Sequence, residues 1–133
     1  MYYFAYDLNL NKKQMLERCP DSKPKFRATL PNYKLIFTGW NRQWRGGVAS
    51  IKLFSGEKVI GAIYEVSETD LRRLDKYEGV PADYNRLNVR VFNEAGDLLE
   101  AVTYIKARQS EETPPSREYL AVIQKGYRDW RII

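Results

Sequence analysis

Strand-like segments outnumber helical ones in this sequence, and this pattern most narrows the choice of fold. Residues typical of strands occupy 2–6, 33–39, 48–54, 58–66, 85–93 and 98–106, with turn residues between the segments. The last two segments flank Glu94–Asp97, which predicts a β-hairpin. The stretch between Pro20 and residue 33 is expected to be looser. Long β segments in a small domain tend to curl, so we predict a barrel or a strongly bent sheet.

Two further regions have the pattern of helices. Asn11 can cap a short helix that continues to about Arg18 and ends at Pro20. Another helix is predicted over residues 116–130. One face of this helix carries Tyr119, Leu120, Ile123, Tyr127 and Trp130. A predominant sheet accompanied by helices is typical of the α+β class.

The length and composition indicate one folded domain. The chain has 133 residues, of which 44% are hydrophobic, enough for a core of its own. Cys19 is the only cysteine, so no internal disulfide bond can form, which is typical of a reducing compartment. No long apolar run with a basic flank occurs at the N-terminus, so we expect neither a signal peptide nor a membrane span. These features favour a cytoplasmic protein without a membrane partner.

The sequence contains no histidine. This absence excludes a serine triad, a zinc hydrolase site and a Cys/His nucleophile, because all three depend on an imidazole. Any chemistry must therefore use carboxylates, tyrosines, lysines or main-chain amides.

Basic residues are concentrated in the first third of the chain. Residues 1–45 contain nine lysines and arginines and three acidic residues, a net charge of +6, and the remainder carries −1. Together with ten tyrosines and three tryptophans, such a region could be a nucleic-acid surface. The basic residues are scattered, and no RNP-like aromatic motif accompanies them. We therefore favour a solvated face and expect no nucleic-acid partner.

The segment SETDLRRLDKYEGVPADY, residues 67–84, begins with a predicted helix. Ser67 and Asp70 have the spacing of a capping box, in which each side chain accepts a hydrogen bond from the main chain of the other residue. Gly79 is placed to end the helix, because glycine readily adopts the left-handed conformation found at helix ends.

An acidic residue lies on the inward-facing stripe of this helix. Leu71, Leu74 and Glu78 are spaced three and four apart, which places them on one face. Burial and the negative end of the helix dipole would both raise the pKa of Glu78, and such a carboxyl group can exchange protons near neutral pH. Two alternatives remain open. The last turn could fray and expose Glu78 to solvent, or Glu78 could pair with a buried arginine such as Arg86.

Four pieces of sequence, in this order, resemble the γ-glutamylcyclotransferase-like family. They are YFAYDLNL at 3–10, WRGGVA at 44–49, LDKYEG at 74–79 followed by Tyr84, and PSREY at 115–119. The resemblance covers nearly the whole chain. It implies an α+β fold in which residues 1–133 form a single domain, a bent mixed β-barrel with flanking helices and a cavity at its mouth.

The resemblance also implies a site and a reaction. In the family, main-chain amides of the loop after the first strand hold the acidic end of a γ-glutamyl substrate. The corresponding residues here are Tyr6, Asp7, Leu8, Asn9 and Leu10. Glu78 corresponds to the proton-transfer residue. The implied reaction is attack of the substrate's α-amine on its own γ-carbonyl, which releases 5-oxoproline and the attached amine or amino acid without a metal or another cofactor.

The family loop has a Gly-Ser pair where this chain has Asp7 and Leu8. Aspartate adopts fewer backbone geometries than glycine, and a carboxylate beside an anion-binding turn repels a substrate carboxylate. The Asp7 side chain is expected either to point away from the cavity or to bind a substrate ammonium group.

Three more residues are candidates for substrate binding. Tyr84 and Arg86 follow Glu78 where a strand would re-enter the cavity, although packing or surface roles are equally open. Tyr119 corresponds to a family tyrosine, but its place on an apolar helical stripe favours a core role. Trp44 and the Gly46–Gly47 pair are interpreted as a turn without chemistry.

Three functions are compatible with these features. The favoured one is a γ-glutamyl-amine or γ-glutamyl-amino-acid cyclotransferase that uses Glu78. The second is a small-ligand binding or regulatory protein that kept the cavity without the activity, which the aspartate at position 7 favours. The third is a nucleic-acid-binding module, which would bind with a steep salt dependence. The protein is expected to be a monomer or a homodimer.

Overall fold

The computed structural model describes residues 1–132. Its elements follow the order β1 (Tyr2–Ala5), η1 (Leu8–Leu10), α1 (Lys12–Arg18), β2 (Lys23–Asn41), β3 (Gly46–Glu65), α2 (Glu68–Glu78), β4 (Tyr84–Asn93), β5 (Leu98–Lys106) and α3 (Arg117–Asp129). The strands close into a barrel in the order β1-β3-β2-β4-β5. The β1–β5 pair is parallel and the other pairs are antiparallel, which confirms the predicted α+β fold with a mixed barrel.

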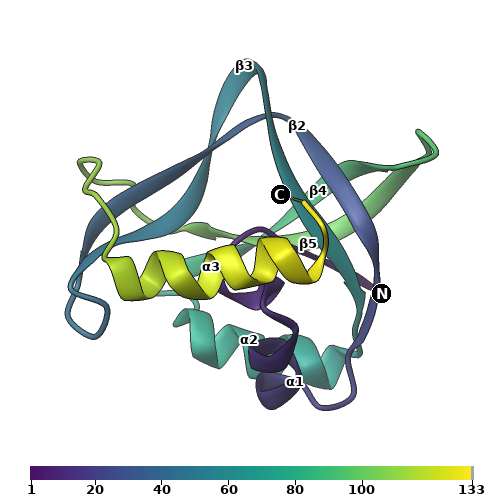
Figure 1. Ribbon diagram of the computed structural model, residues 1–133, viewed down its shortest axis with the longest axis horizontal. Helices are drawn as coiled ribbons and strands as arrows, with labels where there is room; N and C mark the ends of the chain where they lie inside the picture. Colours follow the sequence, from purple (N-terminus) through teal and green to yellow (C-terminus); the bar gives the residue numbers. More distant parts are fainter. Residues whose placement is uncertain (133) are drawn as a thin grey trace.

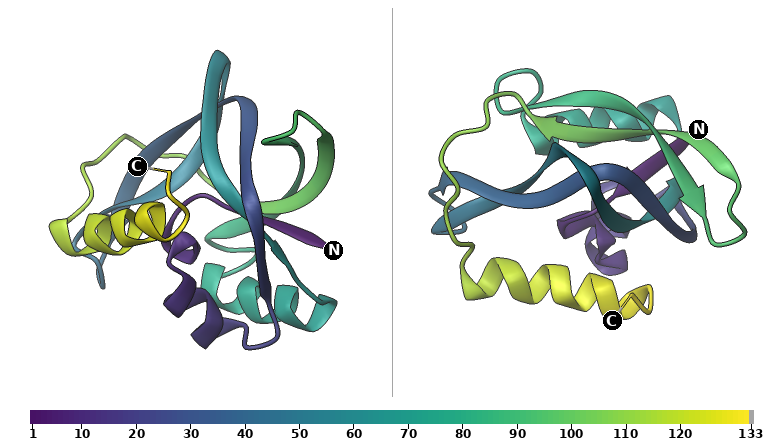
Figure 2. Two further views of the ribbon diagram at one scale, coloured as in Figure 1. Left: turned by 45° about the vertical axis from the view of Figure 1, so that its right-hand side comes forward. Right: turned by 90° about the horizontal axis from the view of Figure 1, so that it is seen from above.

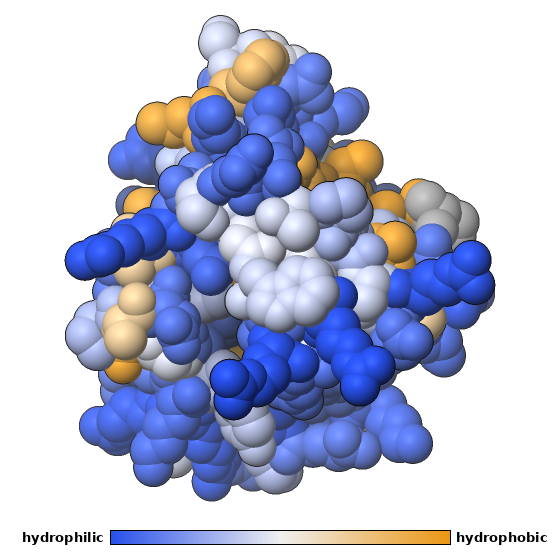
Figure 3. Space-filling model, turned by 90° about the vertical axis from the view of Figure 1, so that its left-hand side faces the viewer, coloured by the Kyte–Doolittle hydropathy of each residue, from blue (hydrophilic) through white to orange (hydrophobic). Residues whose placement is uncertain are grey.

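The long hairpin of β2 and β3 forms most of the barrel and bends sharply at its middle (Figure 1). The register shifts where Pro31 pairs with Lys58 and Tyr33 pairs with Leu53, so residues 54–57 have no partner on β2. Apolar side chains gather on the surface at this bend, at the top of Figure 3. Leu53 is 70% exposed and Phe54 is 46% exposed.

The expectation of a looser stretch between Pro20 and residue 33 is wrong, because β2 already begins at Lys23. Pro24 and Pro31 both lie at shifts in the β2–β3 register. A proline lacks the N–H that a regular ladder requires, and such irregular positions within strands tolerate it. Long-range pairing with β3 therefore makes a strand of a sequence that looks unfavourable for one locally.

The helices lie around the lower part and one side of the barrel in Figure 1. Seen from above, α3 and the β4–β5 hairpin lie on opposite sides of the β2–β3 hairpin (Figure 2). Gly126 lets α3 approach η1 closely, because a Cβ atom there would lie 2.6 Å from the Asn11 main-chain nitrogen. Trp130 Nε1 also donates a hydrogen bond of 2.9 Å to the Leu10 carbonyl. Helix α3 therefore fixes the segment that follows β1.

Helix α2 begins and ends as its sequence predicts. Ser67 caps the helix and forms the capping box with Asp70. Gly79 ends it in the left-handed conformation, with φ of 69°. Leu71 and Leu74 are fully buried, so the same face of the helix carries Glu78 toward the barrel.

Two negative findings concern residues 1–132 only. None of their helices is both long enough and apolar enough to cross a membrane. They also contain no group of three or more Cys, Asp or Glu side chains that could hold a metal ion.

Candidate active site

A cavity of about 230 Å³ is lined by the β2–β3 turn, the segment after β1 and the end of α2. The β2–β3 turn lies on the left in Figure 1. This volume is below the ~300–1,000 Å³ typical of pockets for drug-sized ligands, so the cavity suits a compact molecule. Five of the predicted site residues line it, namely Asp7, Leu8, Glu78, Tyr84 and Tyr119. The structure thus brings together segments from both ends of the chain.

Glu78 is the last residue of α2 and points into this cavity. Within residues 1–132, its carboxylate has neither a hydrogen-bond partner nor an ion-pair partner. Burial and, to a smaller extent, the charge of Asp7 raise the pKa of Glu78 to about 8, against the opposing charge of Arg18. An uncompensated carboxyl group with this pKa can accept and return a proton near neutral pH.

Asp7 contributes a second buried carboxyl group, with only 7% of the residue exposed. Burial raises the pKa of Asp7 to about 6, although Arg18 and the main-chain N–H groups of Asn9, Leu8 and Asp7 itself lower it. Because the two carboxyl groups repel each other when both are ionised, the Asp7–Glu78 pair retains a proton more readily than two separate acids would.

Arg18, at the end of α1, supplies a positive charge to the cavity. Its Nη1 donates a 3.0 Å hydrogen bond to Asn9 Oδ1. Asn9 is itself fixed, since its Nδ2 donates to Tyr3 Oη at 2.9 Å and its carbonyl accepts from Tyr64 Oη at 2.8 Å. A buried network thus orients the guanidinium group.

Two tyrosines of the cavity wall are anchored to the same residue of β3. Tyr84 Oη donates to the Ala49 carbonyl at 2.6 Å, and Tyr119 Oη accepts from the Ala49 N–H at 2.8 Å. Tyr119 also packs edge-on against Trp44, with ring centroids 5.3 Å apart. Both tyrosines combine a packing role with a surface that faces the cavity.

Three loop residues predicted to bind substrate lie outside the cavity lining. Tyr6 is buried, and its hydroxyl donates to the Tyr104 carbonyl at 2.7 Å. Asn9 and Leu10 are completely buried. Only Asp7 and Leu8 of the predicted loop reach the cavity, because the single turn of η1 carries the next residues into the core.

Arg86 also lies away from the cavity, and its side chain forms ion pairs with Asp75 and Glu68. Strand β4 runs beside α2, and two residues along a strand advance about 6.6 Å, close to the ~5.4 Å rise of one helical turn. Tyr84 therefore lies beside the end of α2 with Glu78, whereas Arg86 meets Asp75 one turn earlier. The structure thus places Arg86 in ion pairs beside α2, in the surface role that its sequence left open, and Glu78 has no ion pair with it.

Several lining residues were not identified from the sequence. They are Arg18, Trp40, Trp44, Tyr77, Asp83 and Lys106. Trp44 was interpreted as a turn residue, and the scattered basic residues as a solvated face. No local pattern marks these side chains, because they come from separate elements and converge only in the folded chain.

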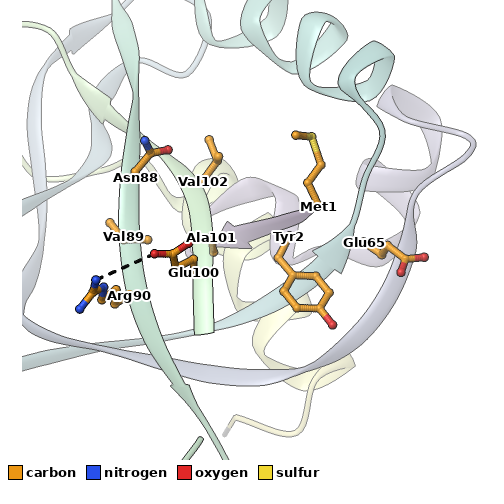
Figure 4. A pocket seen from close by; sticks show the side chains of 9 residues that line it. All are labelled: Met1, Tyr2, Glu65, Asn88, Val89, Arg90, Glu100, Ala101 and Val102. Atoms are coloured by element: carbon orange, nitrogen blue, oxygen red, sulfur yellow. Dashed lines mark ion pairs between the residues drawn. The ribbon is translucent and has the colours of Figure 1, made fainter. Parts of the chain in front are cut away.

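A larger open hollow of about 900 Å³ lies between the start of β1 and the β4–β5 hairpin (Figure 4). Its Arg90 and Glu100 side chains face each other at 4.0 Å, and both are largely exposed. Because its charged groups are solvated and one pair is mutually compensated, this hollow has no sequestered group comparable to Glu78.

The comparisons with known proteins agree with this architecture. The model of the AIG2-like family matches residues 58–130. Human gamma-glutamylcyclotransferase is 30% identical over 132 residues, which cover 96% of this chain and 70% of that protein. The solved structure of a gamma-glutamyl cyclotransferase has a TM-score of 0.92 at 28% identity and covers 98% of this chain and 79% of its own.

A human protein described as uncharacterized has a solved structure that is equally similar. Its TM-score is 0.91 at 29% identity, over 97% of this chain and 79% of that chain. The match to human gamma-glutamylcyclotransferase extends over nearly all of the chain, and the two solved structures share its fold. The chain therefore belongs to the gamma-glutamylcyclotransferase-like family and matches the AIG2-like family model.

Proposed function

We propose that this protein is a γ-glutamylcyclotransferase-type enzyme that cyclises a γ-glutamyl amine or γ-glutamyl amino acid and releases 5-oxoproline. The observation that carries the proposal is the position of Glu78, whose unpaired carboxyl group lies in the cavity with its pKa raised by burial to about 8. The relatives named gamma-glutamylcyclotransferase support the same reaction class.

Glu78 acts as the general base and then as the general acid. Its carboxylate takes a proton from the substrate's α-ammonium group, and the free amine attacks the γ-carbonyl carbon. A new C–N bond closes the five-membered ring, and the original amide C–N bond breaks. Glu78 then returns this proton to the leaving nitrogen and carries to it the second proton, which the ring nitrogen loses on becoming the lactam N–H. The leaving amine departs as an ammonium ion, so the reaction consumes no external acid or base.

The rest of the cavity holds the substrate in its folded-back shape. Asp7 and Leu8 form the wall that follows β1, while Tyr84 and Tyr119 provide aromatic surface anchored on Ala49. Fixing the amine next to the carbonyl supplies much of the acceleration, because the two groups then react as neighbours. Tyr6, Asn9, Leu10 and Arg86 act indirectly in this proposal, by supporting the fold around the cavity.

A ligand-binding or regulatory protein without the activity is the second candidate. The buried carboxyl group of Asp7 favours it, because this group adds a negative charge to the cavity in which the amine must lose its proton. An ammonium ion beside two carboxylates holds its proton more firmly, which favours binding over reaction.

Release of 5-oxoproline from a panel of γ-glutamyl compounds separates the two candidates. The enzyme proposal requires release from at least one member and its loss in Glu78→Gln, with the variant still folded by circular dichroism. Glu57→Gln is a matched control, because Glu57 is exposed in the bulge of β3. If no member reacts while a γ-glutamyl compound still raises the melting temperature, the ligand-binding candidate is correct instead.

A further inference from the structure

The main-chain N–H groups after β1 adjoin Asp7, whose buried carboxyl group lines the same cavity. In η1, the Leu10 N–H is bonded to the Asp7 carbonyl, and the Asn11 N–H to the Leu8 carbonyl. The earlier N–H groups, those of Asp7, Leu8 and Asn9, act on the Asp7 carboxylate instead and lower its pKa. The negative charge of Asp7 would therefore repel a substrate carboxylate that approached these amides.

Arg18 is a better partner for a substrate carboxylate. One guanidinium nitrogen is held by Asn9, and the Tyr77 ring lies 4.7 Å from the guanidinium carbon. Within residues 1–132, no carboxylate lies within ion-pair distance of Arg18. Its remaining N–H groups are therefore available in a fork that matches the two oxygens of a carboxylate.

The second cation of the cavity, Lys106, lies near the Tyr84 wall. Its ammonium group stands 5.6 Å from the centroid of the Tyr84 ring. The charge of Arg18 lowers the pKa of both Asp7 and Glu78. A carboxylate two bonds from the reacting amine must lie close to Glu78, which favours Arg18 over Lys106.

We propose that Arg18 binds the α-carboxylate of the γ-glutamyl group and that Asp7 binds its α-ammonium group. This inference rests on the proposed function, and it differs from the expectation that loop amides hold the acidic end of the substrate. These two contacts, which we call the Arg18–Asp7 clamp, hold the α-carbon beside Glu78. Glu78 takes a proton from the ammonium group as this group leaves Asp7. Asn9 is then a positioning residue, because it orients Arg18 through its side-chain oxygen.

The proposal restricts the substrate class. An accepted compound must carry both a free α-amine and a free α-carboxylate at the end that cyclises. A 4-aminobutyryl amide, which could also close to a five-membered lactam but lacks the carboxylate, is expected to be a poor substrate. A compound with an acylated α-amine is expected neither to bind Asp7 nor to cyclise.

Binding of two small lactams tests the clamp without requiring turnover. The probes are 5-oxoproline, which keeps the carboxylate, and 2-pyrrolidone, which lacks it. We expect the wild-type protein to prefer 5-oxoproline by about 10- to 100-fold, as for hydrogen bonds to a charged group, and Arg18→Gln to remove this preference. Lys106→Gln is the matched control, because it removes a positive charge from the same cavity and should keep the preference.

Each outcome supports or overturns the clamp. A preference that persists in Arg18→Gln, a wild-type protein that binds both lactams equally or neither, or a preference lost only in Lys106→Gln would overturn it. Melting curves establish that the variants are folded, and Arg18→Lys, which keeps the charge without the fork, is expected to give an intermediate preference. If the γ-glutamyl panel gives no product while the binding preference follows Arg18, the proposed activity fails and the clamp stands.

Discussion

The carboxylate of Asp7 raises the pKa of Glu78 in the same cavity. Replacing Asp7 by asparagine removes this charge at nearly constant size, so Glu78 should ionise at lower pH. If Glu78 is the general base, the acid limb of the pH profile of kcat/KM should shift to lower pH by about 1 unit. This shift is expected even if the maximal kcat/KM also changes. Asp83→Asn is the control, since Asp83 also lines the cavity but does not shift Glu78. An acid limb that stays in place would contradict the assignment.

Glu78 is expected to lower the stability of the folded protein at alkaline pH. The unfolded chain releases this proton near pH 4.5, whereas the folded protein holds it to about pH 8. Between these values the unfolded state binds fewer protons, so the free energy of unfolding falls as the pH rises. Glu78→Gln should therefore be more stable than wild type by about 1–3 kcal/mol at pH 9 and equally stable at pH 4. Urea unfolding at both pH values measures this difference, and equal stability at pH 9 would argue that Glu78 is solvated.

Arg86 is expected to affect stability and not substrate affinity. Its Nε and Nη2 donate to the two carboxylate oxygens of Asp75 at 2.9 and 2.8 Å. The pair is partly exposed, so Arg86→Gln should cost only about 0.5–1 kcal/mol. KM for a γ-glutamyl substrate should stay within about twofold, as expected for a residue away from the site. Arg90→Gln, in a more exposed pair with Glu100, should change stability less. A large rise in KM for Arg86→Gln would show that Arg86 takes part in substrate binding.

Gly126→Ala is expected to destabilise the protein although alanine favours helices. Alanine is better than glycine in a helix by about 1 kcal/mol. A Cβ atom at this position would lie 2.6 Å from the Asn11 nitrogen and 2.7 Å from the Leu10 carbonyl carbon, so α3 must move away from η1. The clash should outweigh the helix preference and leave a net cost of about 1–2 kcal/mol in chemical unfolding. Gln124→Ala, on the exposed face of the same helix, should not show this cost.

Tyr119→Phe is expected to leave the buried Ala49 N–H without its 2.8 Å acceptor. A buried donor that loses its partner costs about 1–3 kcal/mol. Thermal unfolding should show a clear decrease in melting temperature. Tyr127→Phe is the control on the same helix, because that tyrosine is only partly buried. A similar loss in both variants would mean that ring packing, and not the bond to Ala49, carries the effect.

Local sequence signals predicted the helices and the β4–β5 hairpin correctly. Asn11, Ser67 and Ser116 each cap a helix by accepting a hydrogen bond from the main chain three residues later. Such caps act within a few residues, so spacing alone reveals them. The inward direction of Glu78 was likewise predicted from its spacing with Leu71 and Leu74 on α2.

The course of β2 could not be predicted locally. Its first half contains two prolines and several basic residues, which look unfavourable for a strand. Pairing with β3 outweighs this local preference, and the prolines occupy shifts in the register. Strand pairing joins residues far apart in sequence, so a local pattern carries little information about it.

The sequence by itself determined that Glu78 ends an amphipathic helix and that no imidazole is available for chemistry. Only the tertiary structure decided which groups meet this carboxyl group. Asp7 follows β1, Arg18 ends α1 and Lys106 ends β5, and closure of the barrel brings these ends to one cavity. Capping and helical periodicity depend on neighbours within a few residues, whereas the pKa of a buried acid depends on every charge around it in space. The direction of Glu78 was therefore readable from spacing, and the charges that surround it were not.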